Sequence, residues 1–132
     1  PRKHFGLMKR IIFILSVITL LTACQKEDKN GDLGGFWKLK QIEEIATDSI
    51  IDLRDKDYFW SIQLKLLTTT GGGKGRFQHV GDSLYIQMIY SPSNLKKFGF
   101  YNPKDERFGV KHLDRNGMIL QSKEAILTFK KF

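Results

Sequence analysis

The chain has 132 residues and a formal net charge of +8, with 41% hydrophobic and 27% charged residues. Four of its basic residues precede Cys24 and no acidic residue does, so from Cys24 onward 18 Lys and Arg face 14 Asp and Glu. The remaining net charge of +4 is ordinary for a small domain, and no nucleic-acid partner is expected. Cys24 is the single cysteine, which excludes an internal disulfide and a cysteine metal site.

The first predicted element is a secretory signal peptide over residues 1–23. The basic pair Lys9-Arg10 precedes residues 11–21, which are uncharged and mainly apolar, and small residues follow just before Cys24. This three-part pattern is typical of a signal peptide. An 11-residue run is too short to cross a bilayer, which needs about 20 residues.

Cys24 ends the sequence Leu21-Thr22-Ala23-Cys24, which resembles the lipobox of bacterial lipoproteins. The resemblance implies cleavage before Cys24, a diacylglycerol on its thiol and added fatty acid such as palmitate. It therefore implies that acyl chains hold the protein on a membrane of the cell envelope. Met8 is the expected translation start, which would place residues 1–7 upstream of the true start.

Residues 24–34 are expected to form a lipidated tether. Gln25-Lys26-Glu27-Asp28 resembles the short acidic export tag of some Gram-negative surface lipoproteins, and Gln25 differs from the aspartate of an inner-membrane retention signal. These resemblances imply an outer-membrane protein that is exposed at the surface. A solvated linker is the alternative, and both descriptions can hold. A flexible tether of roughly ten residues spans under about 20 Å.

Residues 35–132 are predicted to form one all-β domain. Short runs of β-branched and aromatic residues alternate with turn residues, as in a meander of strands. Asn116-Gly117 is a strong hairpin signal, because both residues tolerate positive φ. The eight predicted strands cover residues 35–45, 49–54, 58–69, 75–80, 83–90, 106–113, 117–123 and 125–131.

Alternation along these strands predicts which side chains point inward. The inward sets are Trp60, Ile62, Leu64 and Leu66; Leu84, Ile86, Met88 and Tyr90; and Phe108, Val110 and His112. Short connections predict an up-and-down antiparallel meander. Closure of the last strand on the first would make a barrel that is filled by side chains or holds one small ligand. A β-sandwich is the alternative fold.

One short helix is predicted in the connection between residues 91 and 105. Ser91 could cap it, Pro92 suits its first position and Gly99 suits its end. The same connection carries four apolar side chains, Leu95, Phe98, Phe100 and Tyr101. They would form either a buried lid on the barrel or a gate for an apolar ligand or a partner protein.

The first predicted strand opens with Gly35-Phe36-Trp37, which matches the G-x-W of lipocalins. In that family the tryptophan closes the barrel floor and a basic residue of the last strand packs over its ring. Lys131 has the corresponding place here, and a lysine over an indole suits a cation–π contact. With the meander and the lipobox, the mature chain resembles the small lipocalin-like, or calycin-type, domains of bacterial lipoproteins.

The resemblance also predicts which connections lie at each end of the barrel. With Gly35, Trp37 and Lys131 at the floor, the turns at 55–57, 81–82 and 114–117 are expected beside them. The mouth would carry residues 46–48, the glycine run at 70–74, the 91–105 connection and the last hairpin.

No pattern in the chain predicts catalysis or a metal site. The run Gly71-Gly72-Gly73-Lys74-Gly75 lacks a following Ser or Thr and continues into a strand, so it does not suit a phosphate. His79 and His112 lie on separate strands without a third ligand. The acidic residues Asp55, Asp57, Asp105 and Glu106 are expected to be solvated turn residues. The chain is therefore expected to be no enzyme and to hold no cofactor or metal.

Two functions remain open. The first is binding of a small apolar ligand at the barrel mouth, lined by Tyr90, Phe98, Tyr101 and Phe108. The second is a non-enzymatic interaction or inhibitor protein, with a filled barrel that docks another envelope protein. A cavity of about 300 Å3 or more would favour the first function. A filled interior with an exposed apolar patch would favour the second.

Overall fold

The computed structural model describes residues 31–91 and 94–132, so the signal peptide and Cys24 lie outside the described residues. A 3-10 turn, η1 (Gly31–Leu33), precedes the first strand, and a second, η2 (Leu95–Phe98), lies between β6 and β7. Within the described residues the strands are β1 (Gly35–Glu44), β2 (Ser49–Asp52), β3 (Phe59–Gln63), β4 (Leu66–Thr69), β5 (Lys74–Val80), β6 (Ser83–Tyr90), β7 (Glu106–Leu113), β8 (Gly117–Gln121) and β9 (Ala125–Lys131).

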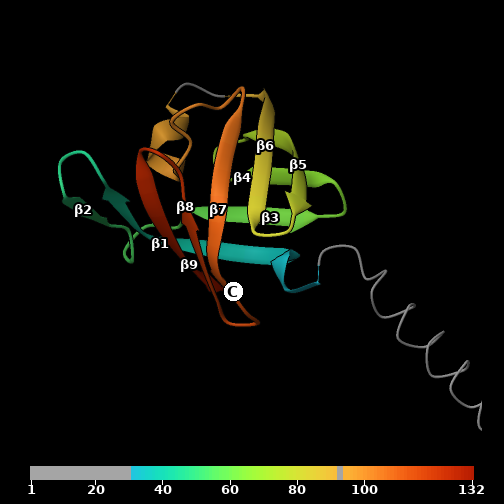
Figure 1. Cartoon of the computed structure of the whole chain (residues 1–132), viewed down its shortest axis with the longest axis horizontal. Helices are drawn as coiled ribbons and strands as arrows, with labels where there is room; N and C mark the ends of the chain where they lie inside the picture. The colour runs from blue at the N-terminus through green and yellow to red at the C-terminus, as the bar shows by residue number, and fades with distance from the viewer. Residues whose placement is uncertain (1–30, 92–93) are drawn as a thin grey trace, which may run out of the picture. The chain divides into compact units, whose positions relative to one another are not determined.

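The strands form a closed antiparallel barrel. Their order is β2-β1-β3-β4-β5-β6-β7-β8-β9, and β1 pairs additionally with β9. This last pairing closes eight strands into the barrel and leaves β2 outside it, beside the far end of β1 (Figure 1). The predicted all-β barrel is confirmed, and the fold is not the β-sandwich alternative.

The eight barrel strands are not the eight that the sequence predicts. Residues 58–69 are two strands, β3 and β4, joined by a turn in which Leu64 has a φ of 54°. The predicted strand 49–54 becomes the extra strand β2, which pairs with the second half of β1, whereas β3 pairs with the first half. Residues 55–57 therefore lie partway along β1, and the prediction that they form a floor turn is wrong.

The barrel interior is packed with large apolar side chains. Three phenylalanine rings contact the Trp60 indole there: Phe100 stacks on it at 4.6 Å between centroids, and Phe108 and Phe129 lie 5.8 and 4.7 Å from it. Aliphatic residues fill the space around them, and the fully buried members include Leu39, Ile42, Ile62, Leu67, Leu84, Ile86 and Met118. Burial of this apolar surface is the main force that stabilises the fold.

Four residues predicted to point inward do not do so. Leu64, which is 76% exposed, and Leu66 are carried outward by the turn between β3 and β4, and Leu67 takes the interior place. Tyr90 follows an irregularity in the β5–β6 pairing and is 62% exposed. His112 follows an irregularity in the β7–β8 pairing and is exposed, because an extra residue in one strand reverses the facing of those beyond it.

The predicted helix in the 91–105 connection is the 3-10 turn η2. Gly99 ends it with a φ of 100°, as predicted, and a Cβ at that position would lie 2.5 Å from the Leu127 side chain. Asn94, and not Ser91, stands before the first residue of the turn, and its side chain makes no capping hydrogen bond. Pro92 lies outside the described residues.

Candidate functional site

The closed end of the barrel brings together Gly35, Trp37 and Lys131. Lys131 Nζ lies 4.3 Å from the centroid of the Trp37 ring and donates hydrogen bonds to the carbonyls of Gly34 and Asp32. Trp37 Nε1 donates to the Leu33 carbonyl at 2.8 Å. Gly35 has a φ of 120°, and a Cβ there would lie 2.8 Å from Lys131 Cε. A side chain at residue 35 would therefore displace the lysine from the indole.

The other end of the barrel is covered by the η2 segment. Its apolar residues Leu95, Phe98 and Phe100 are all buried in the same core as the strands. The Phe98 carbonyl accepts a hydrogen bond of 2.9 Å from Trp60 Nε1, and the Tyr58 ring meets the Phe98 ring edge to face at 4.9 Å. These contacts make the segment a lid that is part of the core.

The four residues predicted to line a ligand site at the mouth do not share one surface. Phe98 is 3% exposed and Phe108 is fully buried, both within the aromatic core. Tyr101 is half-buried beside the lid, and burial raises the pKa of its hydroxyl. Tyr90 lies on the outside of β6. The described residues therefore present no open, apolar mouth lined by this set.

Glu106 is a buried acid, so the prediction that it is a solvated turn residue is wrong. Its side chain is 1% exposed at the start of β7. Glu106 Oε2 accepts a hydrogen bond of 2.6 Å from the backbone N–H of Asn102, while Oε1 has no partner. Burial, with a further contribution from Glu124, raises the pKa of Glu106 from 4.5 to about 7. The alternation of β7 could have indicated this, because Glu106 shares the inward face of Phe108.

The buried carboxyl should make stability depend on pH. A raised pKa means that the folded state binds more protons than the unfolded state between pH 4.5 and about 7, so the free energy of unfolding falls as pH rises through that window. We expect Glu106→Gln to remove this dependence, since an amide oxygen can still accept from Asn102. Wild type should lose about 1–3 kcal/mol relative to the variant between pH 5 and pH 8. Urea denaturation at pH 5 and pH 8 measures the free energy of unfolding of both proteins. If wild type and Glu106→Gln differ by the same amount at the two pH values, the raised pKa of Glu106 is contradicted.

A hollow of about 770 Å3 lies on the outer face of the barrel near the lid. It has a mixed-charge lining with an aromatic member: Tyr85, Asn102, Asp105, Glu106, Arg107, Gly109, Lys111, Gln121, Ser122, Lys123 and Glu124. The Arg107 guanidinium lies 5.7 Å from the centroid of the exposed Tyr85 ring. Asn102 Nδ2 donates to Glu124 Oε1 at 2.9 Å, which ties the lid segment to the hairpin between β8 and β9.

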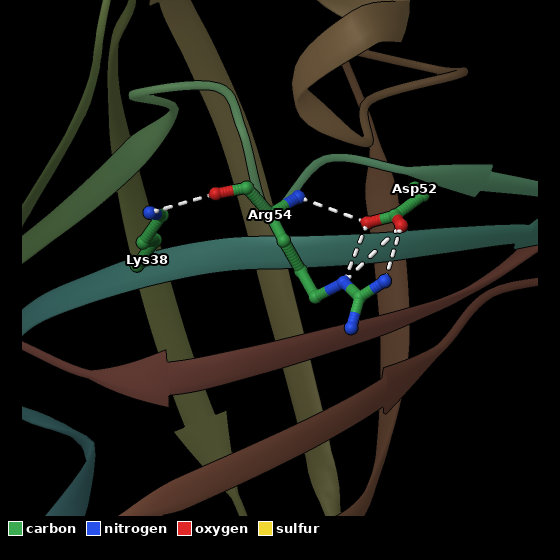
Figure 2. Close-up of polar contacts among 3 residues, drawn as sticks. All are labelled: Lys38, Asp52 and Arg54. Carbon is green, nitrogen blue, oxygen red and sulfur yellow. Dashed lines mark hydrogen bonds and ion pairs between the residues drawn. The ribbon is translucent and has the colours of Figure 1, made fainter.

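Elsewhere among the described residues, Arg54 and His112 each contact an exposed carboxylate. Arg54 binds the Asp52 carboxylate with two nitrogens, at 2.8 Å for the shortest contact, and holds the pKa of that acid well below its usual range. Figure 2 shows this pair together with Lys38, whose ammonium donates to the Arg54 carbonyl at 3.0 Å. His112 and Asp114 form the second pair at 2.8 Å. Hydrogen bonds from the backbone N–H groups of Asn116 and Gly117 lower the pKa of Asp114.

The described residues hold no group of three or more His, Cys, Asp or Glu side chains placed to bind a metal ion. His79 is exposed on β5, and His112 is engaged with Asp114. Among residues 31–91 and 94–132 there is also no helix of the length and apolarity that a membrane span requires.

A closed eight-stranded barrel with a tryptophan floor under a lysine is the architecture of a lipocalin-like protein. The family described as Lipocalin-like domain matches residues 19–132, and the chain belongs to this family. A second family, the prokaryotic membrane lipoprotein lipid attachment site, matches residues 8–25 and thus includes Cys24. The chain is therefore a lipid-anchored lipocalin-like protein of the cell envelope.

Solved structures of similar fold come from Bacteroides species. A lipocalin-like protein from Bacteroides uniformis ATCC 8492 is 20% identical, with a TM-score of 0.64 over 77% of this chain and 100% of its own. A protein from Bacteroides eggerthii DSM 20697 is 15% identical, with a TM-score of 0.60 over 75% of this chain and 98% of its own. At these identities the likeness concerns the fold alone. No protein with a curated description matches the chain.

Proposed function

We propose that the chain is a non-enzymatic interaction protein that docks another envelope protein while acyl chains on Cys24 hold it on the membrane. The packed interior is the observation that carries this proposal. Trp60, Phe100 and Phe108 occupy the centre of the barrel, where a ligand-carrying lipocalin-like barrel would hold its ligand. An apolar ligand bound by Phe98, Phe108, Tyr101 and Tyr90 would first have to displace core side chains.

The outer face of β6 and β7 is the proposed docking surface. Tyr85 and Arg107 lie side by side at the hollow, and tyrosine and arginine are the residue types that most often anchor protein interfaces. Ile89 and Tyr90, also exposed, extend apolar surface along the same strand. Charges of both signs surround the hollow, which suits a polar rim.

The mature protein is proposed to carry palmitate or a related acyl chain on Cys24 and to lie in the outer membrane, exposed at the surface. The tag-like residues Gln25-Lys26-Glu27-Asp28 support this location. The residues between Cys24 and Asp32 would act as the tether, since Leu33 is fully buried and its carbonyl accepts a hydrogen bond from Trp37 Nε1. Such a location would give the docking surface access to other proteins of the envelope.

Photocrosslinking in living cells tests the docking surface. A benzoylphenylalanine at residue 85 of the full lipidated chain should give one discrete adduct with a second protein. The variant Gly109→Trp should abolish that adduct, because Gly109 lines the hollow and a Cβ there would lie no closer than 3.6 Å to Lys111 Cε and 3.8 Å to the Gln121 carbonyl oxygen. The hollow thus has room for a side chain that blocks it without disturbing the sheet.

The matched control is Ile50→Trp, which places the same side chain on the exposed strand β2, away from the hollow and from the docking surface of β6 and β7. The adduct from residue 85 should persist in this control. Absence of any adduct, or an adduct that Gly109→Trp leaves unchanged, would contradict docking at this surface. Circular dichroism of both variants separates lost docking from lost folding.

A further inference from the structure

A basic and aromatic surface covers the outside of β1 and β9 near the barrel floor. Its centre is a hollow of about 350 Å3 lined by Lys38, Lys40, Lys130, Lys131 and Phe132, without any acidic member. Three exposed or partly exposed aromatic rings lie beside it: Phe36, Phe59 and Phe132. We call this set the floor patch.

The charges of the floor patch are brought together by strand register. Lys38 and Lys130 are direct partners in the β1–β9 pairing, and like charges in that position destabilise a sheet. Among the described residues, no carboxylate forms an ion pair with these lysines. Lys38 donates to the backbone carbonyl of Arg54, and the side chain of Arg54 already binds the nearby Asp52 carboxylate (Figure 2). Within the described residues these lysines therefore meet backbone carbonyls, such as that of Arg54 at Lys38, and form no ion pair with an acid.

The aromatic rings border the lysines on the same outer face. The Phe59 and Phe132 rings meet edge to face at 5.3 Å, and Phe59 is the β3 partner of Lys38. The Phe132 N–H donates to the Phe36 carbonyl at 3.0 Å, which holds the last residue of the chain beside the start of β1. Exposed aromatic rings next to lysines are the combination that lies at a bilayer interface.

The lipid attachment site lies within short reach of this surface. Asp32 lies eight positions after Cys24, and eight steps along a fully extended chain span only about 28 Å. The floor patch begins at Phe36, four residues further along the chain. The acyl anchor therefore raises the local concentration of a membrane surface around this end of the domain.

We propose that the floor patch docks on the anionic lipid headgroups of the membrane that anchors Cys24, with Lys38, Lys40 and Lys130 facing phosphate groups and Phe36 and Phe132 at the interface. The proposal depends on the lipid anchor and not on the partner-docking surface of β6 and β7. Basic residues near an anionic surface each strengthen attachment roughly fivefold, and a polybasic patch supplements acyl chains. The lid end of the barrel would then face away from the membrane.

Lysine footprinting tests the docking directly. The full lipidated protein is placed in nanodiscs of phosphatidylcholine alone or with phosphatidylglycerol, and its lysines are labelled with an N-hydroxysuccinimide ester. Labelling of Lys38, Lys40 and Lys130 should be about fivefold slower in the anionic discs. Labelling of Lys74 and Lys104, exposed near the lid, should be equal in both. Salt at about 0.5 M should remove the difference, because it shortens the screening length.

Charge reversal supplies the matched variants. Lys40→Glu with Lys130→Glu should restore labelling of Lys38 in anionic discs to the zwitterionic rate, whereas Lys74→Glu with Lys104→Glu should keep the protection. Equal labelling of the floor patch in both disc types would overturn the proposal, whether the lysines are protected in both or in neither. Protection that survives high salt would also overturn it. Circular dichroism checks that each variant is folded.

Discussion

Replacement of Phe100 by alanine is expected to lower the free energy of unfolding by about 3–5 kcal/mol. Phe100 is fully buried, and its ring stacks on Trp60 at 4.6 Å with the planes 15° apart. It also meets Phe108 at 6.3 Å. Truncation would leave a cavity at the centre of the barrel, so the loss should be that of a core position even though Phe100 lies in a connection between strands.

The control for Phe100→Ala is Tyr90→Ala, which removes a ring of similar size from the outside of β6. Because Tyr90 is exposed, its loss should change stability by no more than about 0.5 kcal/mol. Urea denaturation of both variants measures the difference. A loss below about 1 kcal/mol for Phe100→Ala would mean that the segment over the barrel is a loose gate and not a lid.

Trp37→Ala is expected to cost a similar amount, about 3–5 kcal/mol. The indole is fully buried, its Nε1 donates to the Leu33 carbonyl, and its face receives the Lys131 ammonium. The variant removes the packing and also leaves a half-buried lysine without its aromatic partner.

Phe36→Ala is the matched control for Trp37→Ala, because the neighbouring ring points to the outer face of β1 and is exposed. Its effect on the free energy of unfolding should stay below about 1 kcal/mol. Comparable losses in the two variants would contradict the assignment of Trp37 as the barrel floor. Thermal melts followed by circular dichroism are sufficient for the comparison.

The sequence predicts the barrel because most of its signals are local. Alternation in β6, β7 and β9 follows from a one-sided core, and G-x-W marks the floor. A hairpin does join β7 and β8 near Asn116-Gly117, but neither residue has a positive φ, and the Asp114 carboxylate accepts from both of their N–H groups instead. The turn after Gln63 escapes such reasoning, since Leu64 takes a left-handed conformation that usually favours glycine or asparagine. Apolar and polar residues alternate without interruption across that turn, from Trp60 to Leu66, so the segment is predicted as one long strand.

The surface sites are harder to predict, because they depend on register between distant strands. The proximity of Lys38 and Lys130 follows from the β1–β9 pairing and from no local motif. The hollow around Tyr85 and Arg107 likewise requires the β6–β7 pairing, in which the two residues are partners. Irregularities near Tyr90 and His112 reverse side-chain facing, which a strict period of two cannot anticipate.

A filled barrel should carry no apolar ligand, and this expectation separates the two candidate functions. The most direct measurement is titration of the lipidated wild-type protein in nanodiscs with an apolar fluorescent probe, with empty nanodiscs as the reference. The packing of Trp60, Phe100, Phe108 and Phe129 predicts no saturable fluorescence increase beyond that of the empty discs. Saturable binding of one probe per chain that Phe98→Ala with Tyr101→Ala abolishes would contradict the filled barrel and favour ligand binding at the mouth.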